Sequence, residues 1–345
     1  MRRRAAAAAL LLLCNPTLAR KARAAKVPDT PGRLYGRRAD VAQAAQAIAL
    51  EHALESEWVE GVLAQARFVA QVAQLIMPGA TPAAKDWHAY RARFVEPRRI
   101  EAGAQWWRDN AQWLARAEQR FGVPARIVVG IVGVETFYGR ITGTFRVIDA
   151  LSTLSFDFPS GRSDRSPFFR SELGHFLKLS RREGWDPLAV KGSYAGAMGL
   201  PQFMPSSVLK HAIDFDEDGR VDLAVSAADV VGSVARFLAE HGWQRDMPTH
   251  YTVEPPEKTI DRALLLVPDI VPSFSAAQMV ERGARLSEAA LQHGGALALI
   301  ELRNAELPPS YVAGTQNFYA LTRYNASSYY AMSVVELGRA IAAAL

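Results

Sequence analysis

The amino-acid sequence predicts a mainly helical α+β protein in which a small antiparallel sheet is inserted. Apolar residues recur at helical spacing over much of the chain, for example from Val59 to Ile76. Between Met247 and Pro309 the character changes, because prolines accumulate and short β-prone runs appear. The 345 residues, 49% hydrophobic and 22% charged, are enough for two or three folded domains with a large core.

The helices are predicted from their caps, their apolar spacing and their stop signals. Asp40 is expected to cap an Ala-rich helix, and Ser56 precedes a longer one that ends at the sequence Met77-Pro78-Gly79. A third helix is expected over residues 103–120, and the last from about Tyr329 to Leu345. The strands of the small sheet are predicted at three short runs, Tyr251–Val253, Ala263–Val267 and Ala296–Leu302.

The amino terminus has the three parts of a secretory signal. Arg2, Arg3 and Arg4 form a basic start, residues 5–13 are apolar, and small residues offer cleavage sites up to Ala24. Nine apolar residues are too few to span a bilayer. We therefore expect residues 1–24 to be removed on secretion to the periplasm. Cys14 is an alternative lipidation site, so a lipid anchor or outer-membrane association stays open.

The net charge of the processed chain argues against a nucleic-acid partner. Removing residues 1–24 takes away six basic residues, which leaves 34 basic against 35 acidic ones. The basicity of the full sequence therefore belongs to the leader, and no nucleic-acid partner is expected. Because Cys14 is the only cysteine, the processed chain has neither disulfides nor cysteine metal sites.

The apolar segment Ile127–Gly139, IVVGIVGVETFYG, contains a single charged residue, Glu135. A carboxylate without a partner in apolar surroundings takes up a proton, which makes Glu135 a candidate general acid. Pro124 and Gly139 suit the two ends of one buried helix, although an Ile/Val run this short is equally compatible with a buried strand. A structural ion pair is the alternative role for the carboxylate.

The segment 192–207, GSYAGAMGLPQFMPSS, combines small residues with the polar side chains of Ser193 and Gln202. Phe203 and Met204 add apolar surface, and two prolines stiffen the path. This mixture suits a wall of a sugar-binding groove, where hydrogen bonds orient the ligand and apolar faces pack on it. A tight glycine-rich loop between helices explains the composition equally well.

The acidic segment 214–222, DFDEDGRVD, matches the start of a calcium loop. Asp214, Asp216 and Asp218 alternate, a glycine follows at the sixth position, and Arg220 at the seventh would offer its carbonyl. The twelfth position is a valine, so Asp229 is expected to close the site from the following helix. A calcium ion bound by this loop would have a structural role. The alternative is an acidic turn that is exposed to solvent and binds no ion.

Other kinds of catalytic site find little support in the sequence. The histidines lack the spacing of a zinc pair, and there is no serine-nucleophile elbow, phosphate loop or dinucleotide fingerprint. A two-carboxylate glycosidase would need a second acid beside Glu135. None of the acidic candidates has a distinctive spacing, namely Asp149, Asp157, Asp164 and Glu172.

Five segments in order resemble the B-type, membrane-bound lytic murein transglycosylases of glycoside hydrolase family 103. They are GVETFYGR, DALSTLSFDFP, KGSYAGAMGLPQFMPSS, DFDEDGRVDL and NFYALTRYNASSYYAMSV. The resemblance implies a lysozyme-like core with a helical domain and a small β domain around a groove. The domains implied are a helical domain 25–120 completed by 328–345, a catalytic core 121–246 with a calcium loop, a β domain 247–310, and a groove-lining segment with the terminal helix 311–345.

The same resemblance implies roles for particular residues. Glu135 would be the single acid/base, and the calcium ligands would be Asp214, Asp216, Asp218, the Arg220 carbonyl and Asp229, with Asp229 one residue beyond the usual spacing. Substrate would be bound by a larger set, namely Tyr90, Arg165 in preference to Arg162, Ser193, Gln202, Phe203, Met204, Tyr324, Asn325 and Tyr330. No cofactor would be needed for catalysis.

The activity implied is cleavage of peptidoglycan between N-acetylmuramic acid and N-acetylglucosamine, with a 1,6-anhydromuramyl product. One buried carboxyl would serve as acid and then as base, and the C6 hydroxyl of the same sugar would replace water. A hydrolytic muramidase and an inactive peptidoglycan-binding scaffold are the two rival readings. The expected partners are glycan strands, and the expected state is a monomer.

Overall fold

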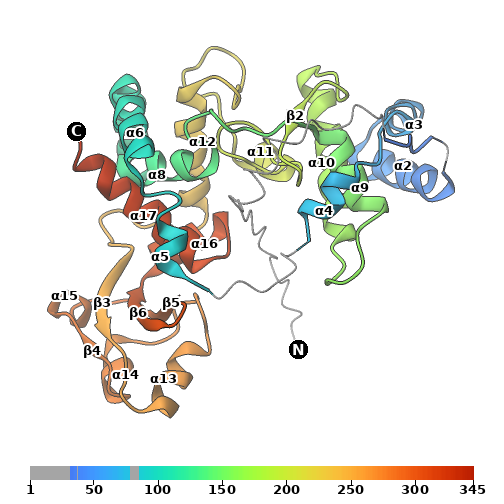
Figure 1. Ribbon diagram of the computed structural model, residues 1–345. Coiled ribbons are helices and arrows are strands. Elements are labelled where there is room, and N and C mark those ends of the chain that lie inside the picture. Colours follow the sequence, from blue (N-terminus) through green and yellow to red (C-terminus); the bar gives the residue numbers. More distant parts are fainter. Residues whose placement is uncertain (1–31, 37, 78–84) are drawn as a thin grey trace. The chain divides into compact units, whose positions relative to one another are not determined.

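In the computed structural model, the placed part of the chain comprises residues 32–36, 38–77 and 85–345, and Figure 1 traces its helices and strands. The predicted signal segment 1–24 with Cys14, and the helix-ending Pro78 and Gly79, lie outside these residues. Within the same part of the chain, no helix combines the length and the apolar character needed to cross a bilayer.

The placed residues divide into two compact units. The first contains residues 85–138 and 231–345, and the second contains residues 32–77, apart from 37, and 139–230. The chain leaves the first unit after Tyr138 and returns to it within α12 (Ala227–Glu240). Each unit is therefore built from segments far apart in sequence. The predicted domain boundaries are finer than this division and stay a prediction.

The first unit contains a helical part and a small sheet. Its helical part consists of α5 (Trp87–Arg91), α6 (Pro97–Asp109), α7 (Ala111–Phe121), α8 (Ala125–Thr136), most of α12, α16 (Gln316–Tyr324) and α17 (Ser328–Ala342). Helix α8 packs against α17. The two approach closely because each has a glycine at the contact: a Cβ on Gly130 would overlap the Val334 carbonyl, and one on Gly338 would overlap the Arg126 carbonyl. This packing fixes the helix that carries Glu135.

The small sheet of the first unit is antiparallel. Its strands lie in the order β4 (Arg285–Leu286), β3 (His250–Glu254), β6 (Leu307–Gly314) and β5 (Ala298–Asn304). Three short helices accompany it, α13 (Thr259–Leu266), α14 (Ala276–Glu281) and α15 (Glu288–Leu291). Leu265, Met279, Leu297, Leu299 and Ala313 form its fully buried core. The inserted antiparallel sheet is therefore present as expected.

The second unit is helical apart from one short strand pair. Its elements are α2 (Ala39–His52), α3 (Ser56–Ala64), α4 (Ala70–Leu75), β1 (Phe145–Arg146), α9 (Val147–Phe156), α10 (Ser166–Glu183), β2 (Lys191–Gly192), α11 (Pro205–His211) and the start of α12. Helices α9 and α10 pack together around fully buried Leu151, Phe169 and Phe176. The strands β1 and β2 pair antiparallel, with Phe145 opposite Gly192.

The prediction of one long helix between Ser56 and Ile76 is wrong, because residues 65–69 separate two helices, α3 and α4. The interruption is stabilised by side chains of α9. The Arg67 amide donates to Asp149 Oδ1 at 2.8 Å, and the Val69 amide donates to Thr153 Oγ1 at 3.0 Å. Hydrogen bonds to distant residues thus replace those of a continuous helix, which periodicity alone does not reveal.

The helix expected over 103–120 is also two helices, α6 and α7, which meet at Asn110. The Asn110 side chain donates to the Trp106 carbonyl at 2.8 Å, and the Asn110 backbone leaves the helical region.

The expected cap of the Ala-rich helix is also different. Arg38 occupies the cap position of α2, and Asp40 lies in the first turn, where it accepts from Arg38 Nε at 2.8 Å. Side-chain hydrogen bonds therefore determine where these helices begin and end.

Of the three predicted strands, β3 and β5 confirm two, while the run Ala263–Val267 lies mostly in helix α13. Only one face of this run is buried, as in a helix at the surface of a core: Leu265 is fully buried, whereas Leu264 and Val267 are exposed. The Ile/Val run before Glu135 is likewise helical, in α8. Short apolar runs do not distinguish helix from strand. The expected terminal helix is confirmed as α17.

The close approach of α8 and α17 generates a first prediction. Gly338→Ala should lower the free energy of unfolding by about 1–3 kcal/mol, because the new Cβ has only backbone to displace. Gly61→Ala in α3 is the matched control, since nothing lies within 4 Å of its Cβ position and alanine is the better helix former by up to about 1 kcal/mol. Chemical denaturation measures both. Equal effects of the two variants would contradict the packing argument.

Candidate active site and candidate metal centre

Glu135 lies in the last turn of α8, and the residue as a whole is partly buried. The Tyr330 hydroxyl, from the start of α17, donates a hydrogen bond to Glu135 Oε1 at 2.7 Å. No basic side chain among the placed residues pairs with Glu135 or affects its pKa. The structure therefore offers no ion pair to explain this carboxylate, which weighs against its purely structural role.

The environment of Glu135 favours the protonated carboxyl. Burial raises its pKa from 4.5 to about 7, and the hydrogen bond from Tyr330 opposes that shift. A group with this pKa carries a proton in about half of the molecules near neutral pH. These are the properties of a general acid that later acts as a base.

Tyrosines surround the carboxyl in the first unit. The rings of Tyr324 and Tyr330 are stacked, 6.2 Å apart and inclined by 16°, and Tyr324 also contacts Phe237 at 4.9 Å. Burial and the charge of Glu135 raise the pKa of both hydroxyls well above 10, so they remain neutral donors. Asn325 is buried, and its Oδ1 has no hydrogen-bond partner in the placed part of the chain.

Tyr90 belongs to the same neighbourhood. It lies in α5, where its ring contacts Phe94 at 5.3 Å and Tyr329 at 5.6 Å, and its hydroxyl contributes to the raised pKa of Tyr330. The structure thus brings four of the predicted residues, Glu135, Tyr90, Tyr324 and Tyr330, into one cluster. The sequence analysis did not identify Phe237 or Tyr329, whose contacts with the cluster cross between helices.

The predicted residues after β2 lie in the second unit and form one tight loop. Ser193 is buried, and its Oγ accepts from the amides of Ala195 and Ala197 at 3.3 and 3.1 Å. Gln202 donates to the carbonyls of Thr142 and Gly199 at 3.2 and 2.9 Å. These bonds show the tight loop that the sequence analysis left open. A sugar-binding role for the same loop remains a prediction.

Phe203 and Met204 continue this loop. Phe203 is buried and bonded through its backbone to Met198, and Met204 precedes α11 with its side chain partly exposed. Of the two loop arginines, Arg162 donates to the Ile76 carbonyl, whereas the guanidinium of Arg165 lies 4.8 Å from the ring of Phe168. Burial and the charge of Arg162 lower the pKa of Arg165.

The four candidate second carboxylates are all engaged within the second unit. Asp149 pairs with Arg146 at 2.7 Å, and Asp157 pairs with Arg38 at 3.0 Å. Glu172 accepts from the Ser206 hydroxyl at 2.6 Å, and Asp164 accepts from the Ser166 amide at 2.8 Å. Asp149 also accepts from the Arg67 amide, so Asp149, Asp157 and Glu172 hold distant segments together as structural acceptors. The Asp164 bond is local, and Asp164 is exposed.

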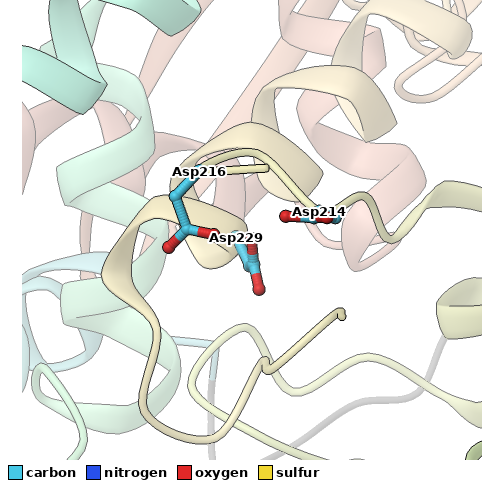
Figure 2. A group of neighbouring side chains, drawn as sticks. All are labelled: Asp214, Asp216 and Asp229. Atoms are coloured by element: carbon cyan, nitrogen blue, oxygen red, sulfur yellow. The ribbon is translucent and has the colours of Figure 1, made fainter. Parts of the chain in front are cut away.

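The acidic loop brings together Asp214, Asp216 and Asp229, as Figure 2 shows. Each contributes one oxygen to a group in which all lie within 4.8 Å of one another. Asp216 Oδ1 is buried and has no hydrogen-bond partner in the placed part of the chain. A buried carboxylate oxygen without a donor, next to two further carboxylates, fits a cation. Burial and the charges of Asp216 and Asp214 raise the pKa of Asp229.

Backbone amides shape this group. Asp214 accepts from the Asp218 and Gly219 amides, and Asp229 accepts from the Phe215 and Asp222 amides at 2.7 Å each. Asp229, which lies in the first turn of α12, therefore belongs to the acidic group, as expected.

Asp218 is not in the acidic group. Its carboxylate is exposed and accepts from the Arg220 amide at 3.1 Å. Ser226, which the sequence analysis missed, donates to Asp216 Oδ2 at 3.1 Å and caps Asp229. A serine at a helix start was the available signal.

Comparison with known proteins identifies the relatives of this chain. The transglycosylase SLT domain family matches residues 36–339. The chain belongs to this family. The membrane-bound lytic murein transglycosylase B of Escherichia coli K12 is 36% identical over 303 residues, which cover 85% of this chain and 80% of that protein. The resemblance stated from the sequence motifs is therefore confirmed.

Solved structures share the fold. The Escherichia coli lytic transglycosylase Slt35, solved in complex with calcium, has 34% identity and a TM-score of 0.79, and the match covers 91% of this chain and 96% of that one. SltB3 from Pseudomonas aeruginosa, solved with NAG-anhNAM-pentapeptide, has 26% identity and a TM-score of 0.70, with 86% and 77% covered. The predicted mainly α, lysozyme-like fold with small antiparallel sheets is confirmed.

The raised pKa of Glu135 generates a second prediction. Since the folded-state pKa is about 7 and the ordinary value is 4.5, the folded chain holds the proton more tightly. This carboxyl thus lowers stability as the pH rises from about 4.5 through 7. Glu135→Gln should melt at a higher temperature than the original chain at pH 8, and the difference should shrink toward pH 5. Calorimetry at several pH values measures it.

A suitable control is Glu118→Gln, which changes another partly buried glutamate of the same unit, one that accepts a hydrogen bond from the Ala125 amide. A melting difference for Glu135→Gln that stays constant from pH 5 to pH 8 would contradict the protonated carboxyl.

Proposed function

We propose that this chain cleaves the β-1,4 bond between N-acetylmuramic acid and N-acetylglucosamine of peptidoglycan by lytic transglycosylation, with Glu135 as the single acid/base. The observation that carries the proposal is a carboxyl beside the Tyr330 hydroxyl that burial holds partly protonated near pH 7 and that has no ion pair with any residue in the placed part of the chain. Membership of the transglycosylase family and the lytic murein transglycosylase relative support it. The activity serves turnover of the cell wall.

The reaction needs two proton transfers through one residue. Protonated Glu135 gives its proton to the glycosidic oxygen, the bond from that oxygen to the muramic acid C1 breaks, and positive charge develops on the sugar. The ionised carboxylate then removes the proton from the C6 hydroxyl, whose oxygen bonds to C1. The proton that leaves Glu135 is thereby replaced, and the product contains a 1,6-anhydro ring with no added water.

An internal hydroxyl explains why one carboxylate is sufficient. A hydroxyl of the same sugar has a high effective concentration at C1, so neither a nucleophile of the protein nor an activated water is required. The engagement of Asp149, Asp157 and Glu172 in structural bonds supports this route over hydrolysis. The anhydro ligand of the related SltB3 structure supports it as well.

Sugar-binding residues are proposed in each unit by itself. Tyr90, Tyr324 and Tyr330 offer aromatic faces near Glu135, and Asn325 supplies a buried amide beside them. In the second unit, Arg165, Ser193, Gln202, Phe203 and Met204 are the proposed sugar-binding residues. Their resemblance to the family motifs supports this assignment.

A structural Ca²⁺ is the second part of the proposal. Asp214, Asp216 and Asp229 would hold it, because their oxygens converge and one buried oxygen lacks a donor. Asp218 and the Arg220 carbonyl would complete the shell, as the family pattern implies. The calcium complex of the relative Slt35 supports calcium as the ion. The ion would fix the start of α12 and would supply no step of the reaction.

The proposed place of action is the periplasm, as a monomer on glycan strands. The signal-like residues 1–24 support secretion, and the relative of Escherichia coli is membrane-bound. Lipidation at Cys14 or association with the outer membrane would provide the corresponding attachment here. No nucleic-acid partner is proposed, because the processed chain has almost no net charge.

The activity is tested with purified sacculi. The original chain should release muropeptides that mass spectrometry finds one water lighter than hydrolysis products. Glu135→Gln keeps the shape but removes the proton, so turnover should fall at least about 10³-fold while glycan binding persists. Asp164→Asn is the matched control, because Asp164 is an exposed acid bonded to Ser166, and it should retain turnover.

Other outcomes favour the rivals. Products with reducing ends would indicate a hydrolytic muramidase. Binding without turnover by the original chain would indicate a scaffold.

The calcium site is tested by thermal melting with Ca²⁺ or a chelator. Calcium at about 100 times its dissociation constant should stabilise the chain by about 2.7 kcal/mol, seen as a melting temperature several degrees higher. Asp216→Asn should abolish this increase. Glu217→Gln, an exposed acid of the same loop outside the acidic group, should keep it. A response that Asp216→Asn leaves unchanged would place the ion elsewhere.

A further inference from the structure

Three consecutive residues directly after the Glu135 helix have left-handed backbones. The φ angles are 52° at Phe137, 56° at Tyr138 and 87° at Gly139. Glycine adopts this region freely, but each aromatic residue there costs about 1–2 kcal/mol. Such strain persists only where the surroundings determine the conformation, and it is concentrated at functional sites. The question is which contacts hold this turn two residues from the carboxyl.

Arg99 of α6 contacts both sides of the turn. Its Nη1 donates to the Gly133 carbonyl at 2.7 Å, and its guanidinium carbon lies 4.5 Å from the centre of the Phe137 ring. Only 13% of the side chain is exposed. The Gly133 carbonyl also accepts from the Phe137 amide at 3.2 Å, so it belongs to the bonds that end the helix. Arg99 therefore binds the last turn of α8 and the strained residue after it.

Two further residues of α6 hold Tyr138. The Trp106 ring stacks on the Tyr138 ring at 5.8 Å, inclined by 30°. The Tyr138 hydroxyl is buried against Gly103, and a Cβ atom at position 103 would overlap it. Arg99, Gly103 and Trp106 are spaced by four and three residues, which places them on one face of α6. We call this set the α6 holding face.

We propose that the α6 holding face, with Arg99 as a positioning residue, fixes the last turn of α8 and so directs the Glu135 carboxyl toward Tyr330 and the substrate. Glu135 lies between Gly133, whose carbonyl Arg99 binds, and Phe137, whose ring Arg99 covers. This inference rests on the proposed function. Without Arg99, the last turn can unwind, because the Gly133 carbonyl loses one of its two donors and the strained Phe137 loses the guanidinium that covers its ring.

Kinetics of Arg99 variants test the proposal. Arg99→Met should lower kcat about tenfold or more with KM changed less than about twofold, because the misdirected carboxyl affects the reaction more than binding. The released turn admits water to Glu135, so the alkaline limb of the kcat profile should move to lower pH. Arg99→Lys should recover only part of the activity, because an ammonium lacks the planar fork that bonds and stacks together.

A double-mutant cycle separates positioning from general stability. Phe137→Leu removes the ring that Arg99 covers, so Arg99→Met should reduce kcat by a smaller factor in that background. Arg116→Met is the matched control, since its guanidinium also covers an aromatic ring, Trp113 at 5.9 Å in α7. It should leave kcat and the pH profile unchanged.

Melting temperatures decide how the kinetic result is interpreted. If Arg99→Met melts lower but keeps its kcat and pH profile, Arg99 is only structural and the proposal is overturned. If Arg99→Met does not fold, Arg99→Lys with Phe137→Leu carries the same cycle, and fully additive effects overturn the proposal. Anhydro products from the original chain show in the same assay that the proposed function stands, so its failure and that of the holding face are distinct.

Discussion

The contact between α8 and α17 sets the environment of Glu135, the proposed acid/base of this protein. Gly130 and Gly338 allow the two helices to approach at backbone distance, and the start of α17 then presents the Tyr330 hydroxyl to Glu135. Most of the water around the carboxyl is replaced by protein, which raises its pKa to about 7. A side chain that is ordinarily ionised is thus partly protonated near pH 7, as the proposed role of proton donor requires.

Two requirements on Glu135 oppose each other. Burial must be deep enough to favour the carboxyl form, yet one edge must stay open to the glycosidic oxygen. Tyr330 reconciles them, since its hydrogen bond stabilises the ionised form that appears after the first proton transfer. The pKa remains near neutrality as a result. With a stronger donor, or a basic residue, the carboxylate would ionise permanently and lose the first step.

Sequence patterns predicted what depends on neighbouring residues and failed where distant contacts decide. The apolar window marked Glu135, and alternating acids marked Asp214 and Asp216. The break between α3 and α4 was missed because it depends on bonds to Asp149 and Thr153, more than 80 residues away. The stacking of Trp106 on Tyr138 was not predicted, because it follows from a turn whose left-handed backbone no composition signal indicates.

The arrangement of acidic side chains explains the choice of reaction. Hydrolysis needs a base beyond the acid, and in the second unit Asp149, Asp157 and Glu172 are committed to bonds that hold loops to helices. Freeing one of them would remove the partner of a buried or half-buried group and cost stability. An internal hydroxyl avoids this conflict, because the substrate itself supplies the nucleophile. A fold that uses its carboxylates as structural acceptors therefore suits a transglycosylase that needs only one.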